Sequence, residues 1–207
     1  MTTSSGLFDR NVPGMTKALQ ASVAGIAGCG GIGSNVAVSL TRAGIGRLVL
    51  VDHDRVEASN LNRQQFVQAD IGRPKVVALG DYLHAIHGGL ALDLHEQRLT
   101  PDNIALVFAN ADVLIEAFDR AEEKQWLLEA WCRHFPDRPI VCASGLGGLG
   151  RTNDLCVRSS GNIYFCGDGE SDMSLGLCAS RVGIAAQMQA NVAIELLVRG
   201  HAHVDRQ

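Results

Sequence analysis

The sequence predicts an α/β fold in which a mostly parallel sheet is flanked by helices, because two hydrophobic patterns alternate along the chain. Apolar runs of strand length are followed by longer amphipathic stretches of helix length. A glycine-rich segment comes directly after the first apolar run, and an aspartate ends the second. The order of strand, glycine turn, helix, strand and acid is typical of a Rossmann-like domain.

Each element is predicted from its own residues. The runs that predict strands are Val23–Ala27, Arg47–Val51, Leu90–Leu94, Val113–Glu116 and Ile140–Ala143. The stretches that predict helices are Gly31–Ala43, Pro74–His87, Ala121–His134 and Ala179–Arg199. Pro74 suits a first helical turn, where its missing N–H is not needed, and Gly200 suits a helix end. Two further short runs, Leu155–Arg158 and Asn162–Phe165, predict an antiparallel or mixed extension near the C-terminus.

The chain length of 207 residues suits one domain with a buried core, and no linker divides it. We expect a single domain over 1–207. It comprises an N-terminal arm (1–22), a nucleotide-binding core (23–144), a crossover region (145–178) and a closing helix (179–200). The acidic stretch 166–174 is rich in small residues and predicts a mobile loop.

Composition argues against several classes of protein. A net charge of -4 does not provide the basic footprint of a nucleic-acid-binding protein. No apolar run is long enough to span a membrane, and the first residues lack the pattern of a secretory signal, so we expect a cytoplasmic protein. None of the six cysteines forms a C-x-x-C pair, which argues against structural zinc and favours free thiols.

The glycine segment is the first functional signal. It reads Gly28-Cys29-Gly30-Gly31-Ile32-Gly33, and the bare backbone of such a loop can approach phosphates while the following helix directs its free N–H groups at them. Asp52, at the end of the second strand, can bind ribose hydroxyls. These features indicate an adenine nucleotide, and an NAD-dependent oxidoreductase would satisfy them as well as an ATP-using enzyme.

Three further motifs follow in order: Asp52 itself, Ser59-Asn60-Leu61-Asn62-Arg63-Gln64, and Gly72-x-Pro74-Lys75. Together with the glycine loop they resemble the ThiF/MoeB/HesA family of carrier-protein adenylyltransferases, relatives of the ubiquitin-activating enzymes. The resemblance runs from about Arg10 to the final helix. The short chain, the Tyr164–Asp168 stretch and the lack of zinc pairs look most like the compact ThiF subfamily.

The resemblance implies ATP and Mg²⁺ as cofactors and a set of residues that hold them. The glycines Gly28, Gly30, Gly31 and Gly33, with Asp52, Ser59, Asn60, Arg63 and Lys75, would bind ATP. Arg63 and Lys75 would also act in catalysis, since they place positive charge on the triphosphate. Asp119 matches the family's magnesium-binding aspartate, although Arg120 follows it where many relatives have Asn. Asp119 is also a candidate cap for the Ala121–His134 helix.

Arg10 resembles the arginine that dimers of the family insert into the partner's ATP site; a surface arginine on a loose arm is the alternative. A homodimer is therefore expected. The implied partner is a ubiquitin-like sulfur carrier with a C-terminal Gly-Gly, ThiS-like and serving the thiazole half of thiamine synthesis. The implied reaction is adenylylation of its carboxylate.

Other functions stay open on the sequence. They are a MoaD-like carrier in molybdopterin synthesis, a small-molecule or tRNA-borne carboxylate, an NAD-dependent oxidoreductase, and a non-catalytic subunit that binds ubiquitin-like proteins. Some relatives use a crossover cysteine, and here Asp172 matches its position, with Cys178 six residues further on. Cys178 is either a nucleophile or a structural thiol. Gly145–Gly150 and the 166–174 loop either form a channel for a Gly-Gly tail or are ordinary turns.

Overall fold

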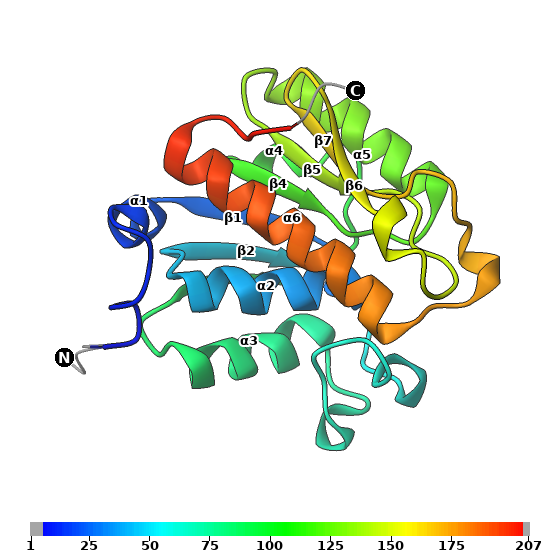
Figure 1. Ribbon diagram of the computed structural model, residues 1–207. Coiled ribbons are helices and arrows are strands. Elements are labelled where there is room, and N and C mark those ends of the chain that lie inside the picture. The colour runs from blue at the N-terminus through cyan, green and yellow to red at the C-terminus, as the bar shows by residue number, and fades with distance from the viewer. Residues whose placement is uncertain (1–5, 205–207) are drawn as a thin grey trace.

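The computed structural model describes residues 6–204, so the ends of the predicted domain, 1–5 and 205–207, lie outside it. A seven-stranded sheet has the order β3-β2-β1-β4-β5-β7-β6 (Figure 1). Its strands are β1 (Val23–Ala27), β2 (Arg47–Val51), β3 (Ala91–His95), β4 (Val113–Glu116), β5 (Ile140–Ala143), β6 (Cys156–Ser160) and β7 (Ile163–Gly167). The helices are α1 (Met15–Gln20), α2 (Gly31–Ala43), α3 (Lys75–Ile86), α4 (Ile104–Val107), α5 (Ala121–His134) and α6 (Ala179–Arg199).

All neighbouring strands pair in parallel except β6 and β7. In β1, the last residue Ala27 pairs with Val51 of β2 and with Glu116 of β4, and Val51 pairs with His95 of β3. The carboxyl ends of these four strands therefore lie in one row. Residues that follow them in the sequence meet at a single edge, where α/β sheets bind their ligands.

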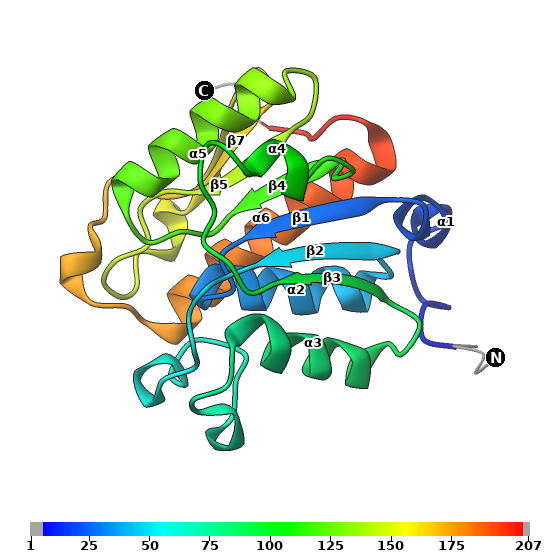
Figure 2. The same ribbon diagram turned by 180° about the vertical axis from the view of Figure 1, so that it is seen from behind.

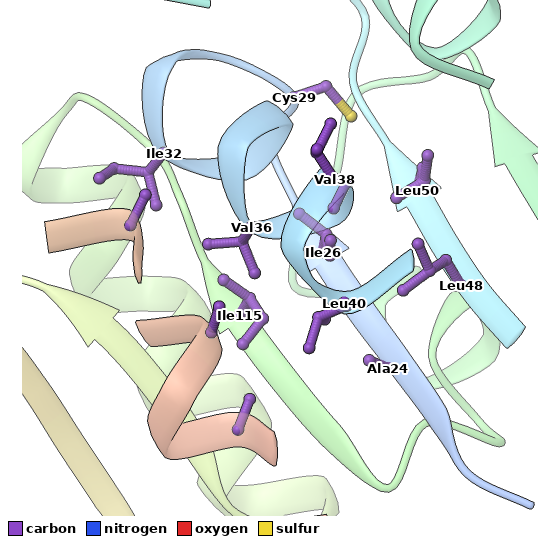
Figure 3. Packing of buried hydrophobic residues seen from close by; sticks show 14 of the residues in the cluster. Ala24, Ile26, Cys29, Ile32, Val36, Val38, Leu40, Leu48, Leu50 and Ile115 are labelled. Atoms are coloured by element: carbon purple, nitrogen blue, oxygen red, sulfur yellow. The ribbon is translucent and has the colours of Figure 1, made fainter. Parts of the chain in front are cut away.

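Helices cover both faces of the sheet. In Figure 1, α2, α3 and α6 lie in front of the strands, while α4 and α5 lie behind them and come forward in Figure 2. α2 packs on the first face through Val36 and Leu40, which meet Ile26 of β1 (Figure 3). On the second face, Trp131 of α5 and Phe108 are fully buried. Each face thus has its own apolar cluster, and the sheet separates them.

The predicted fold class is confirmed, including the antiparallel addition that β6 makes next to β7. Strand and helix bounds differ from the predicted ones by at most two residues. No sequence pattern indicated α1 or α4, which are only six and four residues long. In residues 6–204, no helix combines the length and apolarity that crossing a bilayer requires.

Candidate active site

The loop between β1 and α2 brings backbone, without side chains, to the carboxyl edge of the sheet. Gly28 has φ 95°, and a Cβ there would lie 2.9 Å from the carbonyl oxygen of Ala117. A Cβ on Gly33 would lie 1.8 Å from the carbonyl oxygen of Gly28, so a side chain at Gly33 would force the loop open. α2 begins at Gly31, and the N–H groups of its first turn have no acceptor within the helix. Such a loop can bind phosphate.

Asp52 fixes the geometry of this loop. One carboxylate oxygen accepts a hydrogen bond from the backbone N–H of Cys29 at 2.7 Å, and the other accepts one from the N–H of Asp54 at 2.8 Å. Each oxygen keeps a second lone pair. The buried thiol of Cys29 stays protonated, because burial and the nearby charge of Asp52 raise its pKa well above its usual value.

The two predicted cations, Lys75 and Arg63, have different surroundings. Lys75 is buried, and its Nζ donates to Oδ2 of Asp54 at 2.8 Å. Burial acts to raise the pKa of Asp54, but the hydrogen bond and charge of Lys75 outweigh it and lower that pKa. Arg63 is half-buried and donates to the carbonyl of Ser59 and to Oδ1 of Asn62. Neither guanidinium contact is with an anionic group, so Arg63 retains charge for a ligand.

One cavity of about 240 Å³ lies against these groups. The predicted site residues that line it are Gly28, Gly30, Gly31, Asp52, Arg63, Lys75 and Asp119. They come from five separate parts of the chain, between residues 28 and 119. The row of strand ends at the carboxyl edge of the sheet explains why they meet.

The remaining predicted residues lie elsewhere. Gly33 packs against the carbonyl oxygen of Gly28 and so keeps the loop closed. Ser59 and Asn60 are not among the residues that line the cavity, and Oδ1 of Asn60 instead accepts the backbone N–H of Glu57 at 3.0 Å. The oxygen closes the local 3₁₀ turn, and whether Asn60 binds ribose or phosphate through its amide nitrogen stays a prediction.

Arg10 is far from the cavity of its own chain. The side chain of Asn11 donates to the carbonyl of Ala43 at 2.8 Å, which ties the arm to the C-terminal end of α2. The 13 residues of α2 separate that end from the glycine loop by about 20 Å. Arg10 is exposed there, between the exposed apolar side chains of Leu7 and Val12.

The segment that carries Asp119 is held by a buried ion pair. Glu116 is 1% exposed, and its carboxylate accepts from Nζ of Lys124 at 2.9 Å and from the N–H of Phe118 at 2.7 Å. Burial raises the pKa of Glu116 although Lys124 opposes the rise. The alternative role of Asp119 as a helix cap is wrong: Arg120 occupies the N-cap of α5, without a side-chain bond to the helix. Asp119 itself is exposed.

Carboxylates in this cavity fit a hard divalent cation. Asp54 and Asp119 both line it, and carboxylate oxygens with retained waters are the ligands that Mg²⁺ prefers. Ligand atoms of Asp52, His53 and Asp54 also lie within 4.8 Å of one another. Because Asp54 already pairs with Lys75, a cation at that trio would compete with the ammonium group for the Asp54 carboxylate.

No sequence motif indicates the apolar parts of the cavity. One part belongs to the cluster beneath α4 and α5 and consists of Val51, Leu99 and Phe118, with the polar Gln97 and Glu123 nearby. The other part lies beside α6 and consists of Leu146, Met173, Leu177 and Val182. Gln64, whose buried Oε1 has no hydrogen-bond partner among the described residues, also lines the cavity. Only the rule that ligands bind beyond strand ends could have indicated Gln97 and Leu99, which follow β3.

The acidic stretch 166–174 is not the free loop that its composition predicts. Asp168 is buried, and its carboxylate accepts from the N–H groups of Glu170 and Ser171 and from Arg181. The first two residues of the stretch, 166 and 167, belong to β7.

All six cysteines are free thiols, and Cys29, Cys142 and Cys166 are buried. Cys178 is half-buried at the N-cap of α6. A hydrogen bond with Ser180 and the N–H groups of Arg181 and Ser180 lower its pKa. Whether Cys178 reacts as a nucleophile stays a prediction.

Comparisons with known proteins point the same way as this geometry. Residues 7–206 match the model of the ThiF family. The chain is 33% identical over 198 residues to the sulfur carrier protein ThiS adenylyltransferase of Escherichia coli (strain K12). This match covers 92% of this chain and 78% of that protein. It is 28% identical over 206 residues to the adenylyltransferase and sulfurtransferase MOCS3 of Anopheles gambiae, over 93% of this chain and 45% of that protein.

The chain thus spans about half the length of the MOCS3 relatives. Among solved structures, the E. coli tRNA N6-threonylcarbamoyladenosine dehydratase TcdA in complex with ATP has a TM-score of 0.80 at 21% identity, over 88% of each chain. This likeness concerns the fold.

Proposed function

Because the chain belongs to the ThiF family, we propose that it is an ATP-dependent adenylyltransferase that activates the C-terminal carboxylate of a ubiquitin-like sulfur-carrier protein. The observation that carries the proposal is that one cavity holds the glycine loop, the two cations Arg63 and Lys75, and the carboxylate of Asp119. A dinucleotide oxidoreductase has a diphosphate to bind and less use for two such cations. A non-catalytic binding module has no use for them.

The reaction needs positioning and charge neutralisation more than covalent chemistry. An oxygen of the carrier's carboxylate attacks the α-phosphorus of ATP, the bond from that phosphorus to the bridging oxygen breaks, and pyrophosphate leaves with its electron pair. The product is an acyl-adenylate. Lys75 and Arg63 would stabilise the negative charge that develops on the departing pyrophosphate, and N–H groups at the start of α2 would hold the phosphates.

The free lone pairs of Asp52 suit ribose hydroxyls, and the part of the cavity formed by Val51, Leu99 and Phe118 suits a flat purine ring. Magnesium would be held by Asp119, where it would neutralise phosphate charge when bound. The ammonium group of Lys75 would donate to both Asp54 and phosphate, since its Nζ already donates to Asp54.

The carrier is proposed to be ThiS-like, which would place the enzyme in the synthesis of the thiamine thiazole. Support comes from the relative named ThiS adenylyltransferase, which the chain matches over most of both lengths. The relatives named MOCS3 favour a second candidate, a MoaD-like carrier in molybdopterin synthesis.

We also propose that the enzyme acts as a homodimer in which Arg10 reaches the cavity of the second copy. The distance along α2 prevents Arg10 from serving its own cavity, and the exposed Leu7 and Val12 give the arm apolar groups with which to dock. Mixing Arg10→Ala with Asp119→Ala subunits tests this directly. If Arg10 acts across the dimer, each mixed dimer regains one intact site, and activity reappears. If the mixture stays as inactive as either variant alone, Arg10 does not act across a dimer.

ATP–pyrophosphate exchange tests the main proposal. We expect wild-type exchange to require a carrier that ends in Gly-Gly, and Asp119→Ala to abolish it. Comparing ThiS-like and MoaD-like carriers then identifies the pathway. Exchange that depends on a modified tRNA instead of a carrier, or nicotinamide turnover without any exchange, would reject the proposed substrate.

A further inference from the structure

Arg181 and Asp168 form a buried ion pair that the proposed chemistry does not use. Both side chains are 2% exposed. The guanidinium of Arg181 donates to the carboxylate of Asp168, and its Nη1 also donates to the carbonyl of Gly150. A buried ion pair adds little net stability, because the loss of hydration offsets the attraction between the charges. Its position in the first turn of α6, next to the cavity, points to a geometric role.

Asp168 organises the segment that follows β7. Its Oδ1 accepts from the N–H of Glu170 at 2.9 Å and from the N–H of Ser171 at 2.8 Å, and its Oδ2 accepts from the Ser171 hydroxyl and from Arg181. Burial acts to raise the pKa of Asp168, but these bonds and the charge of Arg181 outweigh it and lower the pKa to about 2. The carboxylate is therefore a permanent charge at neutral pH.

The glycine cluster, Gly145–Gly150, is the surface against which the segment after β7 packs. A Cβ on Gly145 would lie 2.0 Å from Oδ1 of Asp168, and a Cβ on Gly147 would lie 1.8 Å from the carbonyl oxygen of Asp172. The N–H of Gly148 donates to the carbonyl of Gly176 at 2.8 Å. Two segments that are far apart in the sequence thus pack backbone against backbone, and only glycine permits that approach.

These segments provide the α6 side of the cavity wall. Leu146 comes from the glycine cluster, Met173 and Leu177 come from the segment after Asp168, and Val182 follows Arg181 in α6. We call these four residues the crossover wall. Arg181 connects the three elements that carry the wall. It lies on α6, it donates to Gly150 in the glycine cluster, and it donates to Asp168 at the start of the segment after β7.

We infer that the Arg181–Asp168 ion pair positions the crossover wall and thereby sets the affinity of the cavity for the carrier's C-terminal tail. The part about the tail rests on the proposed function. Neither side chain lines the cavity, so both are positioning residues. The groups proposed to hold ATP lie in the glycine loop, just after β2 and β4, at Arg63 and at the start of α3, and within the described residues none of them hydrogen-bonds to the pair. The pair should therefore affect the carrier and leave ATP alone.

The test compares Asp168→Asn and Gly147→Ala with wild type. Asp168→Asn removes the charge while keeping the shape, and Gly147→Ala lifts the segment from its support while leaving both charges in place. Arg199→Gln is the matched control, because Arg199 is an arginine of the same helix whose ion pair with Glu195 is exposed. Two quantities are measured: hydrogen–deuterium exchange of the backbone, and the KM values for carrier and for ATP in pyrophosphate exchange.

We expect amides in 145–150 and 168–177 to exchange about tenfold faster in both variants, because a segment without its anchor opens locally. The KM for a ThiS-like carrier should rise about tenfold or more, since small misplacements of a binding wall are costly. The KM for ATP should stay within about twofold of the wild-type value. Arg199→Gln should match wild type in every measurement.

Unchanged amide exchange in both variants would overturn the inference. So would a KM for ATP that rises as much as the KM for the carrier, because that indicates general damage to the site. If the wild-type protein shows no carrier-dependent exchange at all, the proposed function fails, and the part of the inference about the tail fails with it. The amide exchange still decides whether the ion pair positions the wall.

Discussion

Replacing Lys75 by Met should separate catalysis from stability. Lys75 is 7% exposed, and Met can fill the space of its aliphatic stem without the ammonium group. The only partner the structure gives its Nζ among residues 6–204 is Asp54, whose side chain is 53% exposed. Once Lys75 is gone, water can solvate that carboxylate, so no buried charge is left unpaired.

The magnitudes follow from this geometry. Two unit charges 2.8 Å apart attract by about 1.5 kcal/mol in water and about 6 kcal/mol at an effective dielectric constant of about 20. Side-chain ordering and desolvation offset most of that attraction when one partner is half exposed, so the free energy of unfolding should fall by less than about 1 kcal/mol. Pyrophosphate exchange should fall by about 10²–10³-fold, as it does when one preorganised group that stabilises developing charge is removed.

Urea denaturation measures the first quantity and carrier-dependent exchange measures the second. The control is Arg47→Met, which removes a cation from an exposed ion pair with Asp93 at 3.0 Å, away from the cavity. It should lower stability by a similarly small amount and leave exchange unchanged. A Lys75→Met protein that is folded and keeps exchange within about tenfold of wild type would refute the assignment of Lys75 to the triphosphate.

Three further predictions follow from other contacts. Gly33→Ala should abolish binding of a fluorescent ATP analogue, because its Cβ would lie 1.8 Å from the Gly28 carbonyl oxygen. Gly183→Ala should instead raise the free energy of unfolding by about 0.5–1 kcal/mol, because beyond its own helix backbone no atom of residues 6–204 lies within 4 Å of the added Cβ. Asp168 has its pKa lowered to about 2, so its stabilisation is complete above about pH 4 and is lost as pH falls towards 2; acid denaturation of Asp168→Asn should lack that component. Lys124→Met should cost about 3–5 kcal/mol, because it leaves Glu116 buried without a cation. The pKa of Glu116 is raised in the folded state, so its ionisation opposes folding as pH rises. The stability that Lys124→Met loses relative to wild type should therefore be smaller at pH 5 than at pH 8, and equal losses at the two pH values would contradict this prediction.

The sequence was sufficient for the elements that are long or fully buried. β1, β2, β4 and β5 are continuous apolar runs bounded by glycine or polar residues, and α2 and α6 combine an apolar stripe with a terminal glycine. α1 could not be predicted, because a six-residue helix shows too little periodicity. Its N-cap residue, Gly14, also has no side chain that could signal a helix start. Local patterns therefore predict elements that bury a whole face and miss those held by a few contacts.

The charged half of the site was predictable for a similar reason. Gly28, Asp52 and Lys75 stand in motifs of recognisable spacing, and the row of strand ends brings them together. Asp54 is the partner that spacing could have indicated, because it lies two residues after Asp52. The crossover wall was not predictable, since Leu146 and Met173 meet only through contacts between residues more than twenty positions apart.

The two glycine clusters show why composition alone misleads. Gly33 must be glycine because its neighbour is the carbonyl of Gly28 in the same loop, so that requirement is local and is visible as a motif. Gly147 must be glycine because its neighbour is the carbonyl of Asp172, 25 residues later in the chain. The sequence pattern predicts a phosphate-binding loop for the first run and leaves a channel or ordinary turns open for the second. Close backbone packing instead makes the second run a rigid support, and a rigid support beside a cavity can determine which tail enters it.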